Sequence, residues 1–179
     1  RFGWMAGLDL RNNSYDNREQ YIADFKRSPY SRTVYEAGTV TADNRTEERG
    51  RAAYGELKFR LSQPLLLTLN GRHDFIELDY SDGLNDLEKQ RDFRVSSWRA
   101  GLNYALASDM DFYANASTGF RTPTVTQLFA GDISPFGDTA SNPDLDPEQS
   151  LNMELGLRGT DSWGGVAMDY DVAVYQLDR

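Results

Sequence analysis

Side chains capable of catalysis are scarce in this sequence. Cysteine is absent and His73 is the only histidine, so thiol nucleophiles and zinc–thiolate centres are excluded. A Ser-His-Asp arrangement would need His73, and no nucleophile elbow surrounds that residue. A metal site needs several converging ligands, which one histidine does not supply. We therefore expect no catalytic residue, no metal site and no enzymatic activity.

Carboxylates gather in two polar segments of the chain. They are Asp79, Asp82, Asp86 and Glu88 in the first segment, and Asp144, Asp146 and Glu148 in the second. Oxygen ligands of this type suit calcium, but their spacing fits no EF-hand loop. Solvated loop charge is the favoured interpretation, and calcium binding in these acidic loops is the alternative.

A third group of side chains suits binding rather than catalysis. Exposed aromatic rings beside a positive group can hold a large anionic metal chelate by stacking and charge. The candidates for such ligand contacts are Tyr30, Tyr35, Arg45, Arg121 and Phe136. Packing of loops against one another explains each of these residues equally well.

The overall charge excludes one class of partner. The chain carries 28 acidic and 19 basic residues, for a formal charge of −9 and a pI near 4.6. A negatively charged chain is repelled by the negatively charged phosphate backbone, so nucleic acid is not expected as a partner. No intrinsic cofactor is expected either.

The elements that position these side chains are β-strands, because apolar residues recur with a two-residue period and helical periodicity is nearly absent. In residues 53–61, for example, apolar side chains fall on one face and charged side chains on the other. The alternation places Leu57, Phe59, Leu102 and Tyr104 on an outward face, and Glu56, Lys58, Arg99 and Asn103 on an inward face.

Seven strands are predicted, with connections that alternate in length. The strands lie near residues 1–11, 51–61, 65–80, 93–106, 110–120, 150–159 and 165–178. Long polar connections at 12–50, 81–92 and 121–149 alternate with short ones at 62–64, 107–109 and 160–164. Membrane barrels keep short turns on the periplasmic side and long loops outside. We therefore expect the long connections on the outer face of the cell.

The third strand contains one irregularity. Its apolar residues occupy odd positions at Leu65, Leu67 and Leu69, and even positions from Ile76 to Leu78. This change of parity predicts a β-bulge near Phe75 and Ile76. His73 shares the odd face, and so the lipid-facing side.

Hydropathy is consistent with membrane strands. The mean hydropathy is −0.64, and no stretch approaches the roughly 18 apolar residues of a membrane-spanning helix. Barrel strands keep a low average because lumen-facing and lipid-facing residues alternate. The predicted fold is all-β, an antiparallel transmembrane β-barrel segment. A soluble β-sandwich or propeller is the alternative, and the length of several strands argues against it.

Two sequence motifs are more specific than this periodicity. The first has the form Gly-Phe-Arg-x-Pro followed by Leu-Phe, and the second the form Asn-Pro-x-Leu-x-Pro-Glu. Their residues are Gly119, Phe120, Arg121, Pro123, Leu128 and Phe129, then Asn142, Pro143, Leu145, Pro147 and Glu148. In this order and joined by a loop, they resemble the barrel signature of TonB-dependent outer-membrane receptors. Prolines fix φ and donate no ladder hydrogen bond, so the motifs are expected to shape a loop.

The resemblance implies a larger architecture. Receptors of this family have a barrel of about 22 strands with a plugged lumen. The chain starts and stops in strand-like sequence, so residues 1–179 are expected to be one partial barrel domain of a longer protein. The plug and the box that couples to the TonB complex are then expected upstream, and seven strands alone cannot close the barrel.

The resemblance also implies a location, a function and partners. The location is the bacterial outer membrane, with outer-membrane lipid and lipopolysaccharide as surroundings. The function is TonB-energised transport of a scarce nutrient, with a ferric siderophore as the favoured ligand and other metal chelates, haem, cobalamin or sugar left open. A passive porin or adhesion barrel, and a soluble carbohydrate-binding domain, are the alternatives from other classes.

Overall fold

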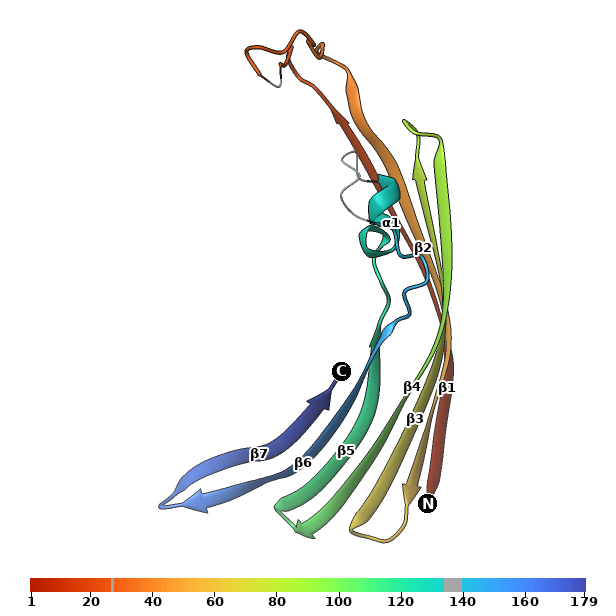
Figure 1. Cartoon of the computed structure of the whole chain (residues 1–179). Helices are drawn as coiled ribbons and strands as arrows, with labels where there is room; N and C mark the ends of the chain where they lie inside the picture. The colour runs from red at the N-terminus through yellow and green to blue at the C-terminus, as the bar shows by residue number, and fades with distance from the viewer. Residues whose placement is uncertain (27, 134–139) are drawn as a thin grey trace.

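The computed structural model describes residues 1–26, 28–133 and 140–179. Seven strands form one sheet in chain order, and every neighbouring pair is antiparallel (Figure 1). They are β1 (Phe2–Gln20), β2 (Val40–Arg60), β3 (Leu65–Asp82), β4 (Leu87–Ala107), β5 (Met110–Arg121), β6 (Glu148–Trp163) and β7 (Val166–Asp178). The predicted all-β antiparallel fold is confirmed, and each predicted strand is present.

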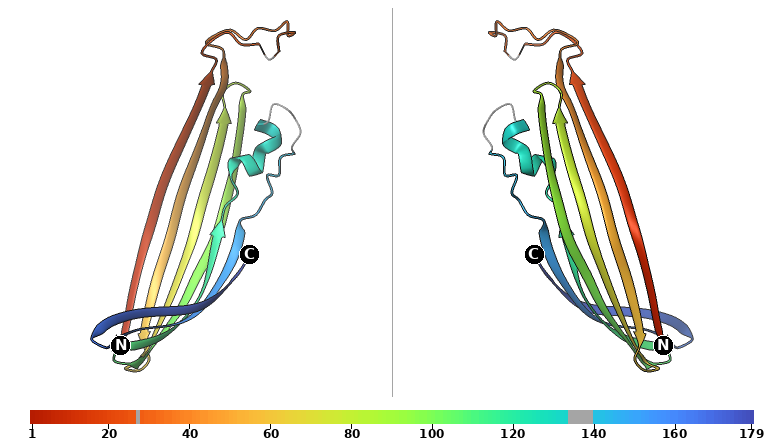
Figure 2. Two further views of the ribbon diagram at one scale, coloured as in Figure 1. Left: turned by 90° about the vertical axis from the view of Figure 1, so that its left-hand side faces the viewer. Right: turned by 90° about the vertical axis from the view of Figure 1, so that its right-hand side faces the viewer.

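The sheet is a curved wall. A short helix, α1 (Val125–Ile133), follows β5 and lies on the concave side of this wall, next to the upper parts of β3 and β4 (Figures 1 and 2). We call the face that carries α1 the inner face and the opposite face the outer face.

Strands β1, β2 and β4 extend well beyond their predicted ends. Asn12 and Arg49 are ladder partners, and pairing continues from there to Asn17 and Asn44, all within the predicted long loop. The loop itself is confined to residues 21–39. The prediction was wrong because polar residues on both faces of a strand were taken for a loop. A backbone ladder and cross-strand ion pairs sustain a polar strand equally well.

The prediction of a long connection at 81–92 was also wrong. β3 and β4 are joined by a tight turn between Asp82 and Leu87, so the strict alternation of long and short connections fails here. The Asp82 carboxylate accepts the backbone N–H of Leu84 at 2.9 Å, which closes the turn, and Asp86 adopts a positive φ of 53°.

The predicted bulge in β3 is absent. Its pairing with β2 and with β4 is continuous through Phe75 and Ile76. The parity changes because the apolar residues change face: Leu67 and Leu69 lie on the outer face, whereas Ile76 and Leu78 lie on the inner face beneath α1. Irregular pairing among the described strands occurs instead at Glu19–Gln20 and near Ala105–Ala107.

The pairing register confirms the predicted facing of side chains. Leu57, Leu69 and Ala100 form one row across β2, β3 and β4 on the outer face. Glu56, Asn70 and Arg99 form the neighbouring row on the inner face. His73 lies on the outer face, as predicted, where its ring nitrogen Nδ1 is 2.9 Å from the hydroxyl oxygen of Ser96. In the lower part of these strands the outer face is therefore apolar and the inner face is polar.

Candidate functional site

The described residues of the loop between β5 and β6 fold against the inner face. It runs from the end of β5 to the start of β6 and contains both sequence motifs. Helix α1 begins after Thr124, whose side-chain hydroxyl accepts the N–H of Gln127 at 3.3 Å. The Gln127 side chain in turn accepts the N–H of Thr124 at 2.9 Å. This reciprocal pair is a capping box, which satisfies two N–H groups that the first helical turn leaves free.

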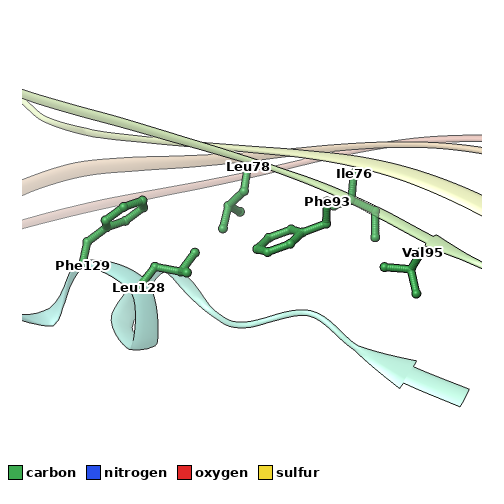
Figure 3. Packing of buried hydrophobic residues seen from close by; sticks show 6 residues of the cluster. All are labelled: Ile76, Leu78, Phe93, Val95, Leu128 and Phe129. Carbon is green, nitrogen blue, oxygen red and sulfur yellow. The ribbon is translucent and has the colours of Figure 1, made fainter. Parts of the chain in front are cut away.

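The helix is held by two apolar side chains. Leu128 and Phe129 are 0% and 2% exposed. They pack against the inner face of the sheet, and Figure 3 shows them pointing toward the apolar side chains of β3 and β4. Those partners are Ile76, Leu78, Phe93 and Val95. Phe129 also interrupts the helix with a φ of −124°, so its ring and the side chain of Leu128 both reach the sheet.

The second motif contacts the first motif and the same apolar cluster. The N–H of Asn142 donates to the carbonyl oxygen of Leu128 at 2.8 Å, and Leu145 packs against the same apolar cluster. Near the end of α1, Asp132 accepts a hydrogen bond from the Ser141 hydroxyl at 2.6 Å and pairs with Lys89 of β4 at 3.3 Å. The Ser141 hydroxyl and the Lys89 ammonium lower the pKa of the Asp132 carboxyl.

The remaining motif residues lie where the chain leaves and re-enters the sheet. Phe120 packs against the apolar cluster, and exposed Arg121 ends β5 opposite Glu148, which begins β6. Pro123 precedes the helix cap, and Pro147 directly precedes β6. Gly119 faces Ser150, whose hydroxyl oxygen would lie 3.1 Å from a Cβ at this position. Pro143 lies between the Asn142 hydrogen bond and Leu145.

Below the loop, the inner face forms a polar hollow of about 470 Å³. Its lining includes Glu56, Lys58, Asn70, Arg99 and Arg158. The Glu56 carboxylate lies 2.8 Å from the Lys58 ammonium. Such a surface offers hydrogen-bond donors and acceptors to a polar partner and contains no arrangement suited to covalent chemistry.

The predicted ligand contacts are not brought together. Tyr35 stacks in an aromatic group with Tyr21 and Phe25 in loop 21–39, whereas Tyr30 in the same loop is 95% exposed. Arg45 lies on the outer face of β2, where it pairs with Glu47 at 2.7 Å, so its placement does not favour contact with a ligand on the inner side. Arg121 lies at the foot of the folded loop. Phe136 lies outside the described residues.

The acidic segments do not converge on an ion. Within the described part of the chain, no group of three or more metal-ligating side chains is placed to hold a metal. No helix among the described residues is long and apolar enough to cross a membrane.

Sequence reasoning missed α1 and its partners on the sheet. Two signals pointed to them. The Thr124-x-x-Gln127 spacing after Pro123 is a helix-start pattern, and the parity change at Ile76 marks an apolar patch on the inner face.

An antiparallel sheet with an apolar outer face, a polar inner face and a loop folded inward defines a segment of a transmembrane β-barrel. The family model described as "TonB dependent receptor-like, beta-barrel" matches residues 1–179. The chain therefore belongs to the family of TonB-dependent receptors, as the two motifs predict.

Curated relatives match parts of the chain. Vitamin B12 transporter BtuB of Photobacterium profundum is 33% identical over 83 residues, which cover 46% of this chain and 12% of the relative. Transferrin-binding protein A of Neisseria meningitidis serogroup B is 32% identical over 77 residues, which cover 43% of this chain and 8% of the relative.

Solved structures share the fold. The ferric citrate transporter FecA in its unliganded form superposes with a TM-score of 0.75 at 17% identity, covering 98% of this chain and 24% of that one. The copper transporter OprC superposes with a TM-score of 0.70 at 16% identity, covering 97% of this chain and 27% of that one. The chain thus spans about a quarter of each of these structures.

Proposed function

We propose that this chain is part of the barrel wall of an outer-membrane receptor that imports a scarce nutrient, with energy supplied through the TonB complex. The observation that carries the proposal is the family match over the whole chain. The complete barrel would have about 22 strands around a plug.

The two faces of the wall fit two different neighbours. The outer face carries large apolar side chains such as Trp4, Leu8 and Val174, whose exposed fractions are 72%, 80% and 69%. Contact of such side chains with water is unfavourable, so this face suits contact with lipid. The polar inner face suits contact with a plug and with water. The loop between β5 and β6 would narrow the entrance from the outside and place Arg121 near the path of a ligand.

The favoured ligand is a ferric siderophore. The fold similarity to FecA, a ferric citrate transporter, supports the choice of an iron chelate as the ligand. Cobalamin is the second candidate, because the vitamin B12 transporters of Photobacterium profundum and Vibrio vulnificus are each 33% identical over the matched residues. Both ligands are large metal chelates, which aromatic and basic side chains can hold by stacking and charge.

Uptake of labelled ligands by whole cells tests the proposal. Cells with the full gene should accumulate one ligand from a panel of iron-55 siderophores and cobalt-57 cobalamin, and cells lacking either this gene or tonB should not. Uptake that persists without tonB would favour a passive porin. Recovery of the protein in the soluble fraction, without detergent, would favour the carbohydrate-binding alternative.

A further inference from the structure

One row of side chains on the outer face combines two arginines with an aromatic ring. The pairing register aligns Leu10, Arg51, Phe75 and Arg94 across β1, β2, β3 and β4. The guanidinium carbon of Arg94 lies 4.8 Å from the centre of the Phe75 ring. Arg51 is the ladder partner of Phe75 on the opposite side, so the aromatic residue lies between two cations.

This row marks the upper border of the apolar band. The four rows below it, from the nearest downward, are Leu8-Ala53-His73-Ser96, Ala6-Gly55-Gly71-Trp98, Trp4-Leu57-Leu69-Ala100 and Phe2-Phe59-Leu67-Leu102. The row above it is Asn12-Arg49-Glu77-Asp92. The change from uncharged to charged side chains therefore falls at Arg51 and Arg94.

The arginines above the border already have close acidic partners. Both Arg45 and Arg49 lie 2.7 Å from the Glu47 carboxylate, and these contacts lower the pKa of Glu47. Arg51, by contrast, has only a long contact with Glu77 at 3.5 Å, and its side chain is 63% exposed. Arg94 is exposed and belongs to none of the ion pairs found among the described residues.

An apolar hollow of about 600 Å³ lies further down the same face. Its small side chains are Ala100, Ala114 and Ala116, and its larger ones include Leu102 and Met153. Ala100 follows Arg94 on β4 at a distance of about 20 Å along the strand, taking roughly 3.3 Å per residue. A hydrocarbon chain that descends from the arginine row can therefore reach the hollow.

We propose that Arg51 and Arg94 bind a phosphate group of a phosphorylated glycolipid of the outer leaflet, namely lipopolysaccharide, whose acyl chain packs in the hollow below. This inference rests on the proposed outer-membrane location. Guanidinium groups form paired hydrogen bonds to phosphate oxygens, and the low dielectric at the edge of the hydrocarbon strengthens such contacts. Phe75 holds Arg94 in place by its ring face.

The test uses the full chain, purified from outer membranes and placed in lipid nanodiscs. Retained lipopolysaccharide is counted by native mass spectrometry for the wild type and for the double variant Arg51→Gln, Arg94→Gln. Retention should fall by about fivefold for each arginine removed, the usual effect of one basic residue at an anionic lipid surface. The matched control is Arg45→Gln with Arg49→Gln, which removes the same charge from the same face and should change retention by less than about twofold, because both of these arginines are already paired with Glu47.

A second arm needs no variant. The wild type should retain chemically dephosphorylated lipopolysaccharide about as poorly as the double variant Arg51→Gln, Arg94→Gln retains the intact form. Equal retention of intact and dephosphorylated lipopolysaccharide by the wild type would overturn the assignment, and so would equal losses of lipopolysaccharide in the two double variants. Recovery of the wild type outside the outer membrane would refute the location and the lipid site together. Normal nutrient uptake by a folded Arg51→Gln, Arg94→Gln variant that still retains the lipid would refute only the lipid site.

Discussion

The depth of an outer-face side chain in the bilayer governs how much a charge at that position destabilises the protein. Leu69 lies on the outer face inside the apolar band, and Leu65 lies on the same face of the same strand at the start of β3, opposite Tyr104. Leu69→Arg should destabilise the full protein by roughly 2–4 kcal/mol, whereas Leu65→Arg should cost about 0–1 kcal/mol, because the cost of a charge depends on its depth in the bilayer. Urea unfolding in lipid vesicles measures both. Equal costs would contradict the placement of the band.

Facing at the level of residues could largely be predicted from the sequence. The alternation at Leu57 and Phe59 predicted the correct face, because contact with lipid is the one factor that would favour apolar residues at these positions. The same reasoning failed at Ile76 and Leu78, because their apolar partner is α1, more than forty positions later in the sequence. A two-residue period shows which residues share a face and does not show what covers that face.

At the scale of the element, α1 should depend on its two buried anchors. Leu128→Ala should weaken docking of the helix by about 2–5 kcal/mol, the usual cost of emptying a well-packed site. The sheet should stay intact, because its strands are held by their own ladders. Hydrogen exchange of residues 125–133 should become faster, while exchange in β3 and β4 is unchanged. Thr126→Ala, at an exposed position of the same helix, is the control, and faster exchange there too would show that Leu128 is not the anchor.

The end of α1 should respond to acid through Asp132. Its folded pKa is lowered by Ser141 and Lys89, so its contribution to docking is fully present above the ordinary value of 3.8. That contribution is lost only as the pH falls through the lowered folded pKa. A spin label at position 126 should therefore keep its mobility from pH 7 to about pH 4 and gain mobility below that range. Asp132→Asn should remove this pH response, and a response centred near neutral pH would contradict the assignment.

The helix also shows where reasoning about elements runs out. Its capping box is visible in the sequence at Thr124 and Gln127, but the helix spans only Val125–Ile133 and is interrupted at Phe129. A segment this short has little intrinsic stability in water, so helical propensity alone does not predict it. It forms because Leu128 and Phe129 find an apolar patch on distant strands.

At the scale of the whole molecule, the sheet order follows from the sequence and the strand lengths do not. Each strand pairs with the next along the chain, as hairpin connections require. The extensions of β1 and β2 carry polar residues on both faces, so the hydrophobic pattern gives no signal there. Cross-strand pairs such as Arg11 with Glu48 hold these extensions together.

The positions of the short turns and of loop 21–39 predict which end of the sheet faces the outside of the cell. The turns at 61–64, 108–109 and 164–165 lie at one end of the sheet, and loop 21–39 lies at the other (Figure 1). Membrane barrels place their short turns in the periplasm, so an epitope inserted after Tyr30 should bind antibody on intact cells. The same epitope inserted between Ser108 and Asp109 should bind only after the outer membrane is permeabilised. Tyr30 is 95% exposed, so the first insertion should leave the strands undisturbed. The reverse pattern of labelling would place loop 21–39 in the periplasm, and a ligand arriving from outside would then first meet the short turns.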